Sequence, residues 1–165
     1  MFKAYCTRVG AGPFPTEIHG AEGDRIREMA GEFGVTTGRA RRIGWFDGVA
    51  AKYSARVNGF DGLIVIRLDT LDGWDEIKIC VAYELDGKRT DQFPIDAARL
   101  ERAKPIYESV PGWTESTRSI TKPSQINDGA KAYLNKLEEV IGVPIKIVST
   151  GPHRDETLVI EDLIG

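Results

Sequence analysis

The stretch from Glu32 to Asp47 reads E-F-G-V-T-T-G-R-A-R-R-I-G-W-F-D, and it carries more chemically active groups than any other part of this chain. Two adjacent threonines stand between glycines, and three arginines follow within four positions. Glycine lets backbone N–H groups approach a ligand, hydroxyls donate hydrogen bonds, and guanidinium forks bind carboxylate or phosphate through two bonds. The pattern therefore predicts an anion site. Its candidate residues are Gly34, Thr36, Thr37, Gly38, Arg39 and Arg41.

The same stretch has a plainer interpretation, because runs of charge usually face water. On that alternative, the arginines form a solvated basic turn before a helix. The apolar spacing of Trp45, Val49 and Tyr53 predicts a helix over residues 44–57. The N-terminus of such a helix would favour negative charge next to the arginines.

Composition bounds the class of protein. With 165 residues and 41% hydrophobic content, the chain is long enough for one domain with its own core, which we expect to span residues 1–165. The net charge of −3 gives no reason to expect nucleic acid or an anionic membrane. Cys6 and Cys80 lie far apart, as do His19 and His153, so no zinc or disulfide framework is predicted. No apolar run or leader pattern indicates a membrane or export, and we expect a cytoplasmic location.

The periodicities predict an α/β fold, in which a mixed sheet with flanking helices carries an antiparallel hairpin. Asp86-Gly87 predicts the hairpin turn, Asp96 is the expected cap of a helix, and Gly34 and Gly142 are expected helix stops. Expected strands cover residues 2–9, 62–69, 76–85, 88–93, 105–113, 143–148 and 157–160. Expected helices cover residues 23–33, 44–57, 95–103 and 123–141.

Arg67 and Asp69 follow the apolar run of residues 62–66, at the carboxyl end of an expected buried strand. Ligands of open α/β sheets bind at that edge. A carboxylate there can accept hydrogen bonds from N1–H and the exocyclic amine of guanine, whereas adenine has no N1–H. The alternative is an aspartate that only initiates a turn. Ser149-Thr150-Gly151 ends another expected strand, and ordinary turn chemistry explains it equally well.

Four segments together resemble the adenylosuccinate synthetase family, which joins IMP to L-aspartate using GTP and magnesium. They are T-R-V-G-A-G-P-F-P-T-E from Thr7, T-T-G-R-A-R-R-I-G-W-F-D from Thr36, R-L-D-T-L-D-G from Arg67, and S-T-G from Ser149. The resemblance covers essentially all 165 residues in order. It implies the carboxyl-terminal portion of that family's P-loop-like fold and a full-length homodimer. One departure is Arg67, where the family usually has lysine.

The resemblance also implies a reaction and roles within it. GTP would phosphorylate O6 of IMP, and the aspartate amine would then displace that phosphate. Aspartate and IMP would be contacted by Val9, Val35, Thr36, Thr37, Gly38 and Arg39, with Arg39 near the IMP ribose. GTP would be contacted by Arg41, Arg67, Leu68, Asp69, Ser149, Thr150 and Gly151. Asp69 would read guanine, the Arg67 plane would stack on the purine face, and Arg41 would neutralise charge between aspartate and the GTP phosphates. We therefore expect Arg39 and Asp69 to converge on one cleft.

The family's phosphate loop, catalytic aspartate, catalytic histidine and Mg²⁺ ligands have no counterpart in this sequence. We therefore expect no catalytic residue in the chain, and no ligase activity from it alone. A first interpretation is one part of a synthetase, whose missing amino-terminal part would be a partner. A second is a non-catalytic module that binds guanine nucleotides or dicarboxylates. A third is a structural piece whose exposed apolar face awaits another chain.

Overall fold

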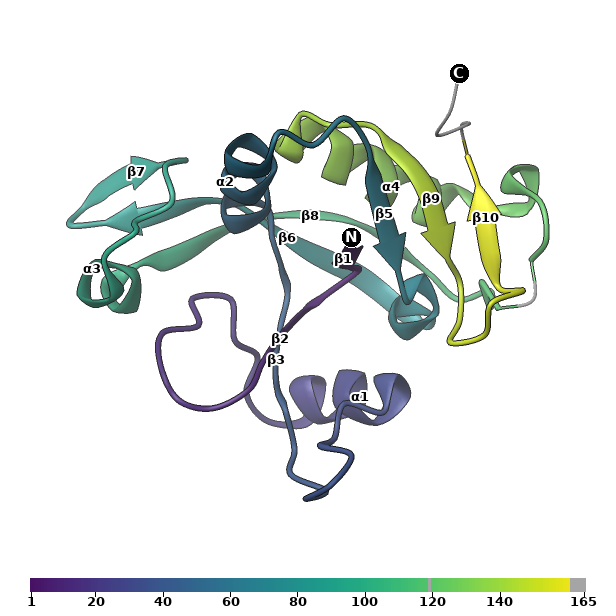
Figure 1. Cartoon of the computed structure of the whole chain (residues 1–165), viewed down its shortest axis with the longest axis horizontal. Coiled ribbons are helices and arrows are strands. Elements are labelled where there is room, and N and C mark those ends of the chain that lie inside the picture. The colour runs from purple at the N-terminus through teal and green to yellow at the C-terminus, as the bar shows by residue number, and fades with distance from the viewer. Residues whose placement is uncertain (119, 161–165) are drawn as a thin grey trace.

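A computed structural model describes residues 1–118 and 120–160 of the chain (Figure 1). Its α-helices are α1 (Ala21–Ala30), α2 (Gly48–Asn58), α3 (Ala97–Arg102) and α4 (Asp128–Ile141), and its short 3-10 turns are η1 (Leu68–Leu71) and η2 (Pro123–Gln125). Its strands are β1 (Phe2–Lys3), β2 (Cys6–Arg8), β3 (Arg42–Gly44), β4 (Phe46–Asp47), β5 (Leu63–Ile66), β6 (Trp74–Leu85), β7 (Lys88–Thr90), β8 (Lys104–Trp113), β9 (Ile145–Ser149) and β10 (Thr157–Val159). The predicted mixed α/β class is confirmed, with the strands divided among three sheets.

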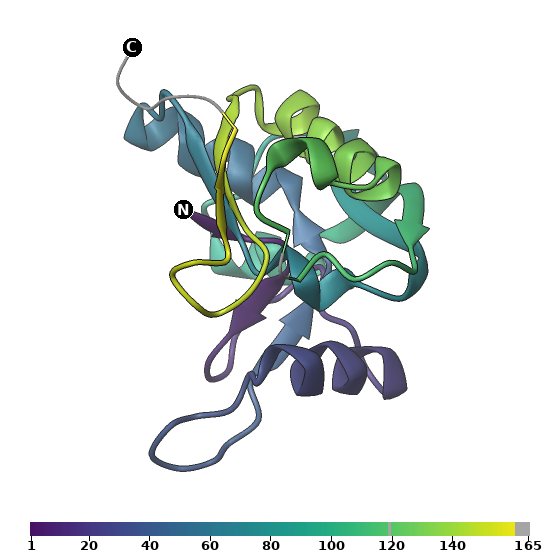
Figure 2. The same ribbon diagram turned by 90° about the vertical axis from the view of Figure 1, so that its right-hand side faces the viewer.

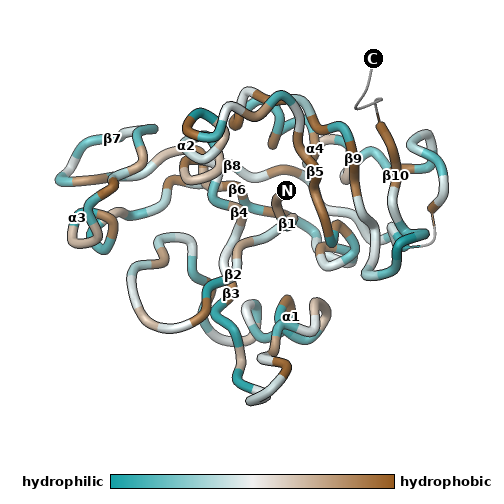
Figure 3. The backbone as a smooth tube through the Cα atoms, viewed as in Figure 1, coloured by the Kyte–Doolittle hydropathy of each residue, from teal (hydrophilic) through white to brown (hydrophobic). Residues whose placement is uncertain are grey.

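The first sheet has the order β1-β5-β9-β10, in which β1, β5 and β9 run parallel and β10 is antiparallel to β9. The prediction of a buried inner strand is confirmed, because β5 lies between β1 and β9 and its Leu63 and Val65 are fully buried. Figure 3 shows the hydrophobic character of β5 and β10 in brown. The parallel pairing of β5 and β9 places their carboxyl ends at the same sheet edge.

The second large sheet is built around β6, which pairs with β7 and β8 in antiparallel fashion and with β4 in parallel. The predicted turn at Asp86-Gly87 is confirmed between β6 and β7. Asp96 caps α3 as expected, accepting a hydrogen bond from the Arg99 backbone N–H at 2.9 Å. A separate two-stranded sheet pairs β2 with β3, and this pairing shapes the site described below.

Helix α4 covers the core and packs against β8 and α2 (Figure 2). Its buried face comprises Ala130, Tyr133, Leu134, Leu137 and Ile141. The expected stop at Gly142 is confirmed, because this residue has φ of 78° and closes the helix on Glu138. The expected start at residue 123 is wrong. Asn127 caps the helix instead, its side chain accepting from the Ala130 N–H at 2.8 Å.

Three further expectations about element boundaries are wrong. The expected strand over 2–9 is interrupted, because the Ala4 carbonyl accepts a hydrogen bond from the buried Tyr133 hydroxyl at 2.5 Å and the chain then changes sheets. The helix expected from residue 44 begins only at Gly48, because β4 pairs with β6 and Asp47 is the N-cap. Helix α1 ends at Gly31, which has φ of 66°, and not at Gly34.

Candidate functional site

The arginine segment forms a closed turn between Phe33 and β3. Gly38 N–H donates to the Gly34 carbonyl at 2.8 Å, and Gly34 N–H donates to the Arg39 carbonyl at 2.8 Å. The Thr37 hydroxyl accepts from the Arg39 N–H at 3.3 Å. All residues from Val35 to Ala40 are exposed, and Val35 is 98% exposed. The tip therefore presents its hydroxyls and guanidinium to solvent on a fixed backbone.

The pairing of β2 with β3 brings the Val9 segment against this turn. Arg8 lies opposite Arg42 in the antiparallel register, so residues that follow β2 lie beside residues that precede β3. Between them lies a cavity of about 540 Å³. It is lined by Arg8, Val9, Gly10, Gly34, Thr37, Arg39, Ala40, Arg41 and Arg42. Four of the predicted aspartate, IMP and phosphate contacts thus share one cavity, while Val35, Thr36 and Gly38 lie outside its lining.

The arginines of this cavity differ in how firmly they are held. Arg42 is fixed by a two-bond pair with Glu17, Nε to Oε1 at 2.8 Å and Nη2 to Oε2 at 2.5 Å, and it donates to the Gly12 carbonyl at 2.7 Å. Among the described residues, the Arg39 side chain has no hydrogen bond or ion pair. Arg39 is therefore available to bind a ligand, whereas Arg42 holds the Gly10–Gly12 loop in place.

The Glu17–Arg42 pair predicts how stability depends on pH. Hydrogen bonding to Arg42 lowers the pKa of Glu17 below its ordinary value of 4.5. A carboxyl with a depressed pKa in the folded state contributes stability that is present above pH 4.5 and lost as the pH falls through the folded-state pKa. We expect Glu17→Gln to destabilise the chain by about 1–3 kcal/mol at pH 7. The difference from wild type should shrink toward pH 3 in urea titrations, and a pH-independent difference would contradict it.

Arg41 is held by a residue for which the sequence suggested no role. Glu32 is 4% exposed, and its Oε2 accepts from Arg41 Nη1 at 2.6 Å. Its Oε1 accepts from Lys3 Nζ at 2.5 Å and from the Tyr5 hydroxyl at 2.6 Å. Burial raises the pKa of Glu32, but the hydrogen bonds from Lys3, Tyr5 and Arg41 outweigh it and hold that pKa below its ordinary value. The available hint in the sequence was a charged residue in the last turn of the helix expected over residues 23–33.

The predicted guanine residues lie at the shared carboxyl edge of β5 and β9. Arg67 adopts φ of 62°, which is rare for a residue with a side chain. Its guanidinium donates to the Ala30 carbonyl at 3.0 Å and to the Asp69 carboxylate at 3.1 Å. Arg67 is thus anchored to the end of α1, and the expectation that it stacks on a purine requires those bonds to change. Leu68 is 0% exposed, backbone included, so this predicted GTP contact has no accessible surface in the structure.

Asp69 faces the same edge with both carboxylate oxygens engaged. Its side chain is 4% exposed, and Arg118 Nε lies 3.3 Å from Oδ2. Arg118 is half exposed and was not singled out from the sequence. A guanine base that reached Asp69 would therefore displace Arg118. Its N1–H and exocyclic amine would replace the single Arg118 Nε donor.

The third predicted segment closes on itself after β9. The Ser149 hydroxyl donates to the Gly151 carbonyl at 2.6 Å, and the Thr150 N–H donates to the Glu156 carbonyl at 2.8 Å. A Cβ at position 151 would lie 2.2 Å from the Glu156 carboxylate, so that side chain would have to move to admit any residue but glycine. This carboxylate accepts from the His153 N–H at 2.8 Å. Ser149, Thr150 and Gly151 are therefore buried and held by hydrogen bonds beside the carboxyl end of β5.

The predicted aspartate and IMP residues and the predicted guanine residues both lie near the end of α1, but they share no cavity. Arg67 binds the last carbonyls of that helix, and Glu32 follows its cap. No cavity found among the described residues contains both Arg39 and Asp69. Figure 2 nevertheless shows the arginine turn and the loop after β9 projecting to the same side of the molecule. The expected convergence of Arg39 and Asp69 on one cleft thus stays a prediction.

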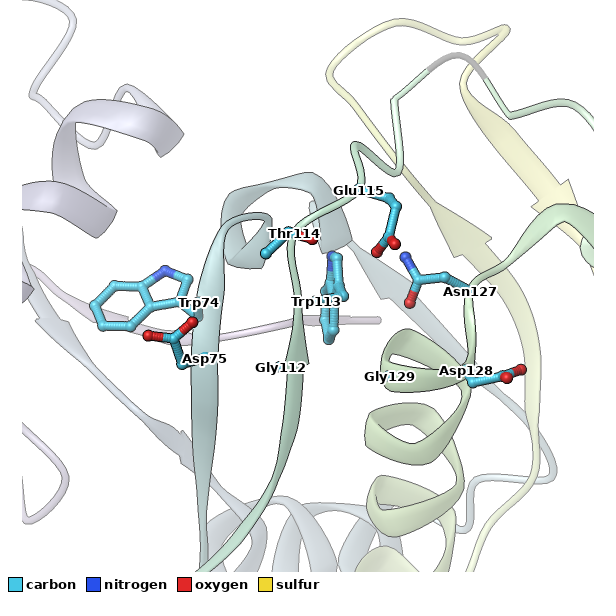
Figure 4. Close-up of a pocket in the computed structure, with 9 residues that line it drawn as sticks. All are labelled: Trp74, Asp75, Gly112, Trp113, Thr114, Glu115, Asn127, Asp128 and Gly129. Atoms are coloured by element: carbon cyan, nitrogen blue, oxygen red, sulfur yellow. The ribbon is translucent and has the colours of Figure 1, made fainter.

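A cavity of about 570 Å³ lies elsewhere, where β6 and β8 meet the start of α4 (Figure 4). It is lined by Trp74, Asp75, Gly112, Trp113, Thr114, Glu115, Asn127, Asp128 and Gly129. The predicted site residues all lie outside this lining. Among the helices of residues 1–118 and 120–160, none has the length and apolar character that crossing a membrane would need.

Comparison with known proteins gives one consistent family. The family model of adenylosuccinate synthetase matches residues 1–158. An adenylosuccinate synthetase of Magnetococcus marinus is 51% identical over 162 residues, covering 98% of this chain and 38% of the relative. One of Xanthomonas oryzae pv. oryzae is 52% identical over 160 residues, covering 97% of this chain and 37% of the relative.

The solved structures agree with the sequences. A structure described as fully ligated adenylosuccinate synthetase from Plasmodium falciparum superimposes with a TM-score of 0.92 at 33% identity. The match covers 97% of this chain and 39% of that one. The chain thus spans less than two fifths of the length of the Magnetococcus and Xanthomonas relatives.

Proposed function

Because this chain belongs to the adenylosuccinate synthetase family, we propose that it supplies the aspartate-, IMP- and guanine-contacting part of an enzyme that joins IMP and L-aspartate at the expense of GTP. The products would be adenylosuccinate, GDP and phosphate. The chain would form the carboxyl-terminal part of that enzyme. A homodimeric assembly and a cytoplasmic location belong to the same proposal, and sedimentation of the complete enzyme would test the first.

The observation that carries the proposal is the cavity beside the arginine turn. Val9 and Thr37 come from segments separated by more than two dozen residues, yet they line the same space with Arg39 and Arg41. A dicarboxylate needs cationic forks and neutral donors in a confined space. Thr37 in the cavity lining offers a hydroxyl, the neighbouring Thr36 offers a second from the exposed turn, and the Arg39 guanidinium offers two parallel N–H donors.

The chemical roles follow from charge and position. Arg39 and the threonines would hold the aspartate carboxylates and so orient the amine toward the purine. Arg41 would offset negative charge between aspartate and the GTP phosphates as the phosphoryl group moves. Asp69 would accept from guanine, with Arg67 and the Ser149–Gly151 wall beside the base. Each of these residues binds or orients, and none is assigned a proton transfer.

We assign no Mg²⁺ ligand and no step through that ion to these residues. Within residues 1–118 and 120–160, no group of three His, Cys, Asp or Glu side chains is placed to hold a metal ion.

We expect Arg39→Ala to weaken binding of L-aspartate about 10- to 100-fold, the loss typical of a charge-assisted pair. Because the Arg39 side chain has no partner among the described residues, the free energy of unfolding of the variant should lie within about 0.5 kcal/mol of the wild-type value. Chemical-shift titration with L-aspartate measures both the affinity and the site.

Arg89→Ala is the matched control, since Arg89 is an exposed arginine of β7 that lines a different cavity. Equal affinities for wild type, Arg39→Ala and Arg89→Ala would refute the aspartate site. The same titration addresses the alternative of a non-catalytic dicarboxylate or guanine-nucleotide module, because such a module would bind without needing any further polypeptide.

A further inference from the structure

Glu32 is a buried charge that the proposed function leaves unused. Its side chain is 5% exposed, and it receives donors from Lys3, Tyr5 and Arg41. A buried carboxylate is costly unless it is paired and hydrogen-bonded. Here Lys3 and Tyr5 donate from the start of the chain and Arg41 donates from beyond the arginine turn, so the cluster ties β1 and Tyr5 to both ends of that turn.

Arg41 is bound to Glu32 through its backbone as well as its side chain. The Arg41 N–H donates to the Glu32 carbonyl at 3.0 Å, and the Arg41 carbonyl accepts from Arg27 Nε at 2.8 Å. The guanidinium uses Nη1 for Glu32, and the side chain remains 32% exposed where it lines the cavity. The fork of arginine can hold one carboxylate and still present donors to a second anion.

The charges of the cluster do not cancel. One carboxylate faces two cations, Lys3 and Arg41, and Tyr5 stays a neutral donor because burial raises its pKa. The cluster therefore retains a net positive charge, and only Arg41 of its members lines the cavity. An anion in the cavity meets a guanidinium that is already oriented, so less rotamer entropy is lost on binding.

We propose that Glu32 is a positioning residue, which fixes the Arg41 guanidinium at the cavity wall so that one arginine serves both the buried carboxylate and an anionic substrate. The inference rests on the proposed function, since that function makes Arg41 a substrate contact. It differs from a purely structural role for Glu32, which would support the fold without affecting binding.

A double-mutant cycle on L-aspartate affinity tests the inference. We expect Arg41→Ala to weaken binding about tenfold or more and Glu32→Gln about fivefold. In the Arg41→Ala background, Glu32→Gln should change affinity less than about twofold, because its effect passes through Arg41. Additive effects, or a Glu32→Gln variant that loses thermal stability while binding normally, would overturn the proposal.

Arg41→Lys is the second variant, and it keeps a cation beside Glu32 if Glu32→Gln fails to fold. The lysine ammonium is a compact charge without the planar pair of N–H donors of a guanidinium. Once it pairs with Glu32, it is no longer directed at a ligand in the cavity. We expect it to bind aspartate as weakly as Arg41→Ala, and wild-type affinity would overturn the shared-fork idea.

A ligand-free readout separates this inference from the proposed function. The NMR signal of the Arg41 Nε–H group should shift and broaden in Glu32→Gln, whereas Glu108→Gln, which alters the Lys136 ion pair between β8 and α4, should leave it unchanged. If wild type does not bind aspartate, the proposed function fails while this signal still reports on Glu32. If the Arg41 Nε–H signal is unchanged in Glu32→Gln, that result alone would overturn the positioning role.

Discussion

Asp69→Asn is expected to remove the preference of this chain for GDP over ADP. Guanine offers two donors, N1–H and the exocyclic amine, to an acceptor-only carboxylate, whereas the amide of asparagine turns one acceptor into a donor. Hydrogen bonds to a charged group contribute about 1.5–3 kcal/mol, so the preference should fall by about 10- to 100-fold. Calorimetry with both nucleotides measures the ratio directly.

The surroundings of Asp69 make this ratio the appropriate measurement. Its carboxylate binds Arg67 and Arg118, so the substitution also disturbs two ion pairs, and absolute affinities and stability will change. The ratio of GDP to ADP affinity cancels that common effect. Asp75→Asn is the control, because Asp75 is an exposed carboxylate on β6, outside the β5 sheet.

Two results would count against the guanine assignment. A variant that discriminates between the nucleotides as wild type does would exclude Asp69 as the base reader. A wild-type chain that binds neither nucleotide would leave the guanine half of the proposal without support, although the aspartate cavity would stand on its own test.

The features predicted correctly from the sequence depend on near neighbours in the chain. Asp86-Gly87 makes its turn, Asp96 caps α3 and Gly142 ends α4 because the chemistry of each lies within a few residues. Such local preferences act wherever the segment is placed. The hairpin and these helix ends could therefore be located without reference to the rest of the fold.

The errors share a different cause, which is a partner distant in the sequence. Trp45 was assigned to a helix because its spacing to Val49 is helical, but pairing of β4 with β6 extends this part of the chain. The strand from residue 2 is broken where Tyr133 binds the Ala4 carbonyl, 129 residues away. Spacing along the chain cannot show either contact.

The same distinction applies to the site. The arginine turn was found because its threonines, glycines and arginines are contiguous. The sequence does not indicate Glu32 or Arg118, because each matters through a contact that exists only in the folded chain. Glu32 binds Lys3, and Arg118 binds Asp69. Residues that hold other residues in place are the part of a site that sequence patterns show least.

Gly112→Ala is expected to have the largest effect on folding. Gly112 lies on β8 between β6 and the first turn of α4 (Figure 4). A Cβ at this position would lie 1.8 Å from the Trp74 carbonyl oxygen, and the Gly112 carbonyl is 2.6 Å from where a Cβ of Gly129 would be. These are backbone atoms, which cannot rotate away as a side chain can, so the strand, its partner or the helix has to move.

We expect a loss of about 3 kcal/mol or more, at the upper end of what overpacking costs. Against a total stability of about 5–15 kcal/mol, this should lower the midpoint of urea unfolding clearly. Ser109→Ala is the matched control on the same strand, because Ser109 is exposed and should change stability within about 0.5 kcal/mol. Equal stability of Gly112→Ala and Ser109→Ala would mean that β8 does not approach β6 and α4 as closely as the structure places it. The register from Trp74–Trp113 onward, which holds the second large sheet together, would then need revision.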